Sequence, residues 1–167
     1  DALVVFSRAL RIQGKVVEAE KTALEGIEVL RKVHETDHPL FSATLITLAH
    51  TLRAQKRMDE SEALYREALA IDQKLLGDGH PGVISTLWEL ASMLNDQGKE
   101  AEAMEIYRRA LEATRGSKVI TPENAEKRLM DFAHQLYRQN KFSEAEPLYR
   151  ELVRSRASRT PADPAGV

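Results

Sequence analysis

The sequence repeats itself every 42 residues without an insertion, and this regularity constrains the fold more than any other feature. A triplet at 13–15 recurs at 55–57, 97–99 and 139–141, always with glutamine first and lysine or arginine last. Self-similarity at such a fixed period is typical of arrays in which each repeat packs on the next. Small residues keep the same interval before and after the triplet: Ser7, Ala49, Ala91 and Ala133, then Ala19, Ser61, Ala103 and Ala145.

Each repeat is predicted to contain two helices joined at the triplet. In the second repeat, Leu45, Leu48 and Leu52 have the spacing of one helical face, and a second such face follows the triplet. The small residues are expected where the two helices cross, because helices approach to about 8–10 Å only over small side chains. Asp59 and Ser143 are predicted to cap the second helices of their repeats.

Proline marks the expected start of three repeats, at His38-Pro39, His80-Pro81 and Thr121-Pro122, since proline is tolerated in the first turn of a helix. The predicted array covers residues 1–159, in units of roughly 1–38, 39–80, 81–121 and 122–159. Residues 160–167 are expected to form a disordered tail or the stub of a linker.

Composition argues against several classes of function. The chain has 24 basic and 26 acidic residues and a net charge of −2, which gives no general attraction to nucleic acid or to an anionic membrane. It contains no cysteine, which excludes disulfides and thiolate metal sites and suits a reducing compartment. No stretch approaches the roughly 20 apolar residues of a membrane span. We therefore expect a cytoplasmic protein without a membrane partner.

The pattern resembles tetratricopeptide repeats (TPRs) of the 42-residue kind found in kinesin light chains. The resemblance covers essentially the whole chain. It implies an all-α fold, an α-solenoid with right-handed superhelical twist, built from four helix-turn-helix units and eight helices. The residues that carry it are Leu48-Ala49, Ala68-Leu69-Ala70-Ile71, Leu76-Gly77-Asp78-Gly79-His80-Pro81, Gln97-Gly98-Lys99 and Ser143-Glu144-Ala145-Glu146-Pro147-Leu148-Tyr149-Arg150.

The resemblance also implies that the first helix of each pair lines the concave side of the solenoid, where a peptide or protein segment would bind. Each of these helices has a second, non-core face in the sequence. From the first repeat to the fourth, the faces are Val4, Val5, Arg8, Arg11 and Ile12; Ile46, Thr47, His50, Arg53 and Ala54; Trp88, Glu89, Ser92, Asn95 and Asp96; and Met130, Asp131, His134, Tyr137 and Arg138.

These faces suggest a binding groove with two features. Trp88, Ile46 and Met130, together with Tyr137, stand where a solvated face would carry charge, and aromatic and arginine side chains dominate binding hot spots. The first half is basic and the second largely acidic, which predicts a ligand with an acidic segment over repeats one and two and an apolar anchor near Trp88. Under the alternative interpretation, Trp88 packs against a neighbouring helix and the charges are only solvated.

Other functions find less support. The chain has no phosphate-binding glycine loop, nucleophile elbow or metalloprotease motif, so neither enzymatic activity nor a cofactor is expected. His50 and His134 lie two repeats apart, too far to share a metal ion. RNA-binding helical repeats need a basic concave face, which Glu89, Asp96 and Asp131 oppose. An intramolecular scaffold role within a larger protein is the alternative to peptide binding, and apolar ends could drive end-to-end self-association.

Overall fold

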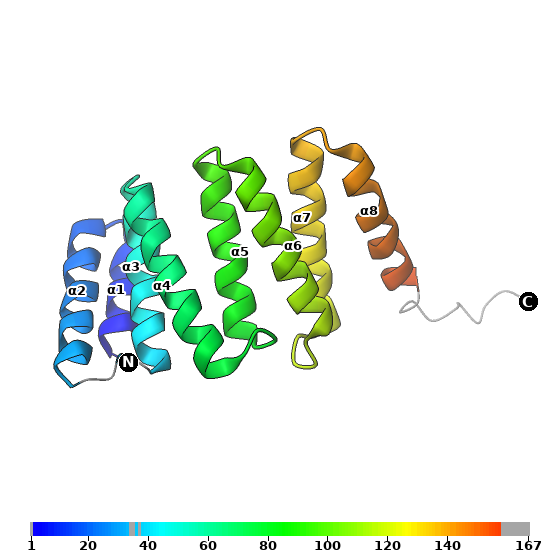
Figure 1. Ribbon diagram of the computed structural model, residues 1–167. Helices are drawn as coiled ribbons and strands as arrows, with labels where there is room; N and C mark the ends of the chain where they lie inside the picture. The colour runs from blue at the N-terminus through cyan, green and yellow to red at the C-terminus, as the bar shows by residue number, and fades with distance from the viewer. Residues whose placement is uncertain (1, 34–35, 37, 158–167) are drawn as a thin grey trace, which may run out of the picture. The chain divides into compact units, whose positions relative to one another are not determined.

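The computed structural model describes residues 2–33, 36 and 38–157, and all the regular structure within these ranges is helical. The predicted tail at 160–167 lies outside the described residues. Within residues 1–117, and again within residues 118–167, successive helices run antiparallel (Figure 1). They are α1 (Ala2–Ile12), α2 (Val16–Lys32), α3 (Pro39–Ala54), α4 (Met58–Leu76), α5 (Pro81–Asp96), α6 (Glu100–Gly116), α7 (Pro122–Arg138) and α8 (Phe142–Ala157).

The helices pair into four hairpins, α1–α2, α3–α4, α5–α6 and α7–α8, which we call hairpins 1 to 4. They form two compact units: residues 1–117 contain hairpins 1 to 3, and residues 118–167 contain hairpin 4. Within the first unit, α3 packs on α2 and α5 packs on α4. Hairpins 2 and 3 therefore each cover one face of the hairpin before them.

The small residues lie at the helix crossings, as the spacing predicts. Ala49, Ala91 and Ala133 are fully buried, and so is Ser7. A hydroxyl joins the same two positions in hairpins 1 and 2, with donor and acceptor exchanged: Ser7 Oγ donates to the Ala19 carbonyl at 2.7 Å, and Ser61 Oγ donates to the Ala49 carbonyl at 2.8 Å. Serine can therefore replace alanine at a helix crossing, because its buried hydroxyl donates a hydrogen bond to the backbone of the facing helix.

The turns within the hairpins share one backbone conformation. The middle residue of every triplet is left-handed, with φ of 79° at Gly14, 66° at Lys56, 76° at Gly98 and 59° at Asn140. Only glycine adopts this conformation without steric cost, so Lys56 and Asn140 are held there by the packing of the helices on either side.

The helix starts differ from the sequence prediction in their chemistry. Asp59 and Ser143 are not caps, because α4 begins at Met58 and α8 at Phe142, which places both residues inside their helices. In hairpins 2 and 3, the histidine before the proline caps the first helix. His38 Nδ1 accepts from the Leu40 amide at 3.0 Å, and His80 Nδ1 accepts from the Gly82 amide at 3.1 Å. The His-Pro pair therefore both caps and starts the helix.

Candidate functional site

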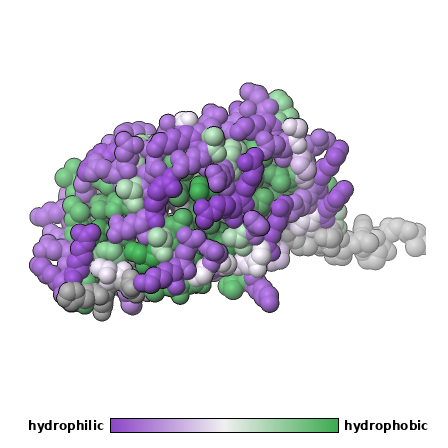
Figure 2. Space-filling view, viewed as in Figure 1, coloured by the Kyte–Doolittle hydropathy of each residue, from purple (hydrophilic) through white to green (hydrophobic). Residues whose placement is uncertain are grey.

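The non-core face of α3 lies between two hollows in the first compact unit. Both hollows have a volume of about 310 Å³, and the side chains of Ala43, Ile46 and His50 border both of them. We call these three residues the α3 ridge. Figure 2 shows hydrophilic side chains over much of the visible surface, with apolar residues between them.

The first hollow lies between α1 and α3 and is basic. Its lining adds Val4, Arg8, Arg11 and Thr47 to the α3 ridge. Arg8 is exposed and Arg11 is half-buried. The Nε atom of Arg11 is buried and has no hydrogen-bond partner among the described residues. A buried donor without a partner carries a desolvation cost.

The second hollow lies between α3, α4 and α5 and is acidic. Asp72 and Glu89 line it together with Ser42, Thr86 and the α3 ridge. The Asp72 side chain is buried and accepts a hydrogen bond from Ser42 Oγ. Burial raises the pKa of Asp72, against the hydrogen bond from Ser42 and the charge of His80, which both act to lower it.

His50 lies at the C-terminal end of the α3 ridge, where its imidazole is neutral and fixed in orientation. Its Nδ1 atom lies 2.9 Å from the Tyr65 hydroxyl, and the two rings meet edge to face. Burial lowers the pKa of His50; the charge of Glu89 opposes this shift, whereas the nearby arginines add to it. The imidazole therefore offers hydrogen-bonding groups to the site but no positive charge near neutral pH.

Arg53 joins the second and third hairpins and is not a free cation. Its Nη2 atom donates to Ser92 Oγ at 2.9 Å, its Nε atom donates to Asp96 at 3.1 Å, and Glu89 lies 3.7 Å away. Burial acts to lower the pKa of Arg53, but the hydrogen bond and charge of Asp96 outweigh it and raise this pKa. Of the predicted basic residues, Arg8 and Arg11 are therefore the ones that charge the first hollow.

Trp88 is a correction to the sequence prediction. Its side chain is only 4% exposed, so it lies in the core and offers no apolar anchor on the surface. The indole packs against Tyr107, with ring centroids 5.3 Å apart, and its Nε1 atom lies 3.5 Å from Thr114 Oγ1. Thr47 is also buried, at 7%. The alternative interpretation, in which Trp88 packs against a neighbouring helix, describes its environment.

The other predicted residues divide between the two compact units. Glu89, Ser92 and Asn95 are half-buried on α5. Met130 is half-buried on α7, and its sulfur lies 4.0 Å from Arg156 of α8. Asp131, His134, Tyr137 and Arg138 are exposed on the same helix. The structure brings together, around the first hollow, five of the predicted residues: Arg8, Arg11, Ile46, Thr47 and His50.

Two residues at this site escaped the sequence prediction. Neither Asp72 nor Ser42 belongs to the non-core faces predicted from the sequence, yet their bonded pair lines the second hollow. The signal that could have revealed them is a break in the repeat. The equivalents 42 residues later are Ile84 and Thr114, so hairpin 3 lacks both the hydroxyl donor and the carboxylate.

Metal and membrane sites find no support in this part of the chain. Among the described residues, no three histidine or acidic side chains gather closely enough to hold a metal ion. None of the described helices has the length and apolar character needed to cross a membrane.

Helical hairpins that follow one another along the chain, with small residues where the two helices of a pair cross, define the class of helical repeat proteins. Residues 40–116 match the family model of the tetratricopeptide repeat. No curated protein sequence matches the chain significantly.

Solved structures share the fold over nearly the whole chain. BtubC (BKLC) from P. vanneervenii superposes with a TM-score of 0.88 at 16% identity, over 99% of this chain and 66% of that one. Kinesin light chain TPR-like repeats from Podosopora anserina superpose with a TM-score of 0.83 at 22% identity, over 98% of this chain and 78% of that one. The predicted tetratricopeptide repeat is confirmed by the family model, and the predicted all-α solenoid fold is confirmed by these solved structures, which include kinesin light chain TPR-like repeats.

Proposed function

We propose that the chain is a protein-interaction module that binds an extended peptide segment across the α3 ridge, with an acidic side chain in the first hollow. The tetratricopeptide fold supports a general role as a protein-interaction scaffold. The observation that carries the finer proposal is the pair of hollows, each of about 310 Å³, on the two sides of Ala43, Ile46 and His50.

The opposite charges on the two sides of the α3 ridge determine which end of the peptide lies in which hollow. Arg8 and Arg11 favour a carboxylate in the first hollow through the positive charge of their guanidinium groups. Asp72 and Glu89 favour a donor or a cation in the second. An apolar ligand side chain would rest on Ile46 between them. This arrangement keeps the predicted order of basic then acidic, but places the apolar contact at Ile46 and not at Trp88.

Binding of a short fluorescein-labelled peptide with the central sequence Glu-Leu-Lys, followed by anisotropy, tests the proposal, because its two charges match the basic first hollow and the acidic second one. A Lys-Leu-Lys peptide of equal length is the comparison ligand. Arg11→Glu is expected to weaken binding of the Glu-Leu-Lys peptide by about tenfold, because it replaces a positive charge beside the ligand's carboxylate with a negative one. Ile46→Trp, which fills the space on the ridge, should weaken binding of the same peptide by a similar factor.

Arg109→Glu is the matched control, since it makes the same charge change at an exposed position on α6, away from both hollows. It should leave binding of the Glu-Leu-Lys peptide unchanged. Equal affinity for the two peptides, or equal losses from Arg11→Glu and Arg109→Glu, would show that this groove is not the binding site.

A further inference from the structure

The outer surface of α8 carries an open apolar hollow in the second compact unit. The hollow has a volume of about 630 Å³ and lies along α8, with Tyr137 of α7 at one edge. Tyr137, Phe142 and Val153 are 58%, 52% and 68% exposed. Its lining residues, which we call the α8 end surface, are Tyr137, Phe142, Ala145, Glu146, Tyr149, Arg150, Val153 and Arg154.

The repeat register shows what kind of surface covers such a helix. Tyr149 and Val153 of α8 are the equivalents of Ala23 and Ile27 of α2, three repeats earlier. In the first compact unit, Ala23 and Ile27 belong to the same buried cluster as Leu48 of α3. The α8 end surface is therefore the kind of face that the first helix of another hairpin covers.

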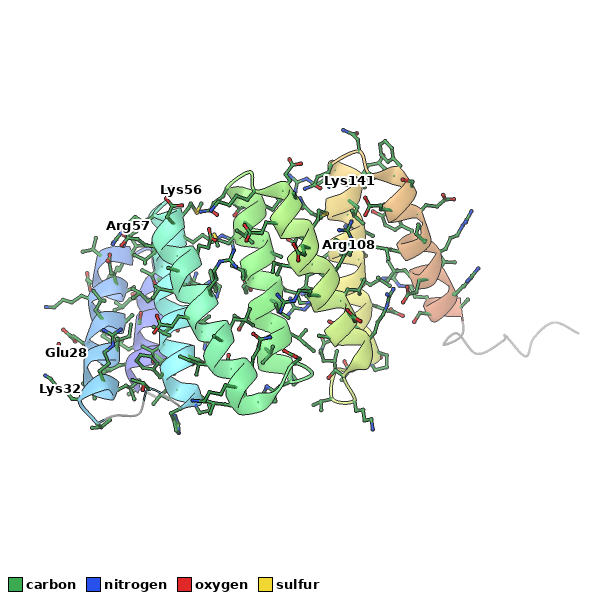
Figure 3. The ribbon with its side chains drawn as sticks, in the orientation of Figure 1. Glu28, Lys32, Lys56, Arg57, Arg108 and Lys141 are labelled. Carbon is green, nitrogen blue, oxygen red and sulfur yellow. The ribbon has the colours of Figure 1, made fainter. Side chains whose placement is uncertain are left out.

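A polar contact accompanies the apolar one at both hairpin interfaces of the first unit. Glu20 of α2 receives a hydrogen bond from Gln55 at 2.8 Å and pairs with Arg57, both in the turn of hairpin 2. Glu62 of α4 pairs with Lys99, in the turn of hairpin 3, at 2.6 Å. Arg57 lies at this turn in Figure 3. An acidic residue on the second helix thus receives the last residue of the next triplet.

The α8 end surface keeps this acceptor. Glu146 stands at the position of Glu62, and it pairs with Arg150 at 2.7 Å as Glu62 pairs with Arg66 at 2.9 Å. Since Glu62 binds Arg66 and Lys99 together, the pair within α8 leaves Glu146 able to accept a second cation.

The complementary surface lies on hairpin 1 of the same chain. Phe6 of α1 is the equivalent of Leu48 and Leu90, which are 4% and 0% exposed, but Phe6 itself is 56% exposed. The triplet of hairpin 1 supplies Gln13 and Lys15, the equivalents of Gln55 and Arg57, and both are exposed. We call Phe6, Gln13 and Lys15 the α1 end surface.

We infer that two copies of this chain associate head to tail, with the α1 end surface of one copy seated on the α8 end surface of the next. Phe6 enters the apolar hollow against Tyr149 and Val153, and Lys15 pairs with Glu146. The two surfaces are different, so the contact is heterologous and each added copy leaves one surface of each kind open. The association therefore produces open chains of copies, whose length grows with concentration. It does not depend on peptide binding at the α3 ridge.

Sedimentation of the purified chain from micromolar to millimolar concentration tests the inference. The weight-average mass is expected to rise with concentration and to pass the mass of a dimer. A mass that stays at the monomer would overturn the inference, because the α8 end surface would then be left to a partner of another sequence. A plateau at the dimer would overturn it too, since it indicates a closed contact.

Substitutions distinguish the proposed contact from nonspecific association. Phe6→Asp should abolish association, and Glu146→Lys should weaken it about five- to tenfold. Lys15→Glu should have a similar effect alone, and an equimolar mixture of Lys15→Glu with Glu146→Lys should associate again. Glu105→Lys, at an exposed position on α6 outside both surfaces, is the matched control. Equal effects of Glu146→Lys and Glu105→Lys, or no recovery in the mixture, would contradict the assigned contact.

Discussion

Hairpins 2 and 3 follow the same 42-residue register but differ in how the space between their two helices is filled. In hairpin 3, Trp88 turns inward and its indole nitrogen lies beside Thr114. In hairpin 2, Ile46 and Asp72 occupy the equivalent positions, the carboxylate bonds to Ser42, and a hollow of about 310 Å³ remains open beside them. A large side chain that reaches the facing helix closes the surface, whereas a smaller one leaves a place for a ligand.

The largest expected effect comes from truncating the two equivalent residues. Trp88→Ala should lower the free energy of unfolding by about 3–5 kcal/mol, because it leaves a large cavity beside Tyr107. Ile46→Ala, at a half-buried position that borders open hollows, should cost only about 1 kcal/mol. Urea unfolding followed by circular dichroism measures both. Similar losses for the two variants would mean that the two positions are packed alike.

The next effect concerns the buried carboxyl that only hairpin 2 contains. Burial raises the pKa of Asp72, so the folded protein holds this proton to higher pH than the unfolded chain does. The Asp72 contribution to stability is therefore fully present below the unfolded pKa of about 3.9 and is lost as pH rises through the folded pKa.

Asp72→Asn removes this titration while keeping an acceptor for Ser42. We compare the free energy of unfolding of the Asp72→Asn variant with that of the unaltered protein. The variant should gain stability relative to the unaltered protein as pH increases from about 4, and this gain should level off above the folded pKa of Asp72. Taking the difference cancels the other groups, among them His50, whose lowered pKa destabilises the fold as pH falls. A difference that stays flat across this range would show that the Asp72 environment does not favour the protonated form.

The smallest effect separates the turns of the two hairpins. Lys56 and Gly98 have nearly the same left-handed φ, 66° and 76°. Lys56→Gly should raise the free energy of unfolding by about 0.5–1 kcal/mol, because it relieves the steric cost of a β-carbon in this conformation. Gly98→Lys should lower it by a similar amount. Thermal unfolding of the two variants measures the pair, and changes of the same sign would contradict a shared turn geometry.

The sequence by itself determined the repeat, the helices and the crossings. These features depend on contacts between residues that are close along the chain or a fixed 42 residues apart, such as the Ser7 and Ser61 hydroxyls at equivalent crossings. Local spacing and side-chain size are sufficient to predict them. The same reasoning placed Arg8, Arg11, Ile46 and His50 on one open face, and the structure gathers them around one hollow.

Only the tertiary structure decided which side chains of that face turn inward. Trp88 and Ile46 have the same helical position, and the choice between core and surface depends on whether the facing helix offers Thr114 or Asp72. Arg53 likewise forms ion pairs with Asp96 and Glu89 across a hairpin interface, so its charge is neutralised there. Periodicity predicts the direction of a side chain but not the size, charge and hydrogen bonds of what it meets, because these are properties of the packed neighbour.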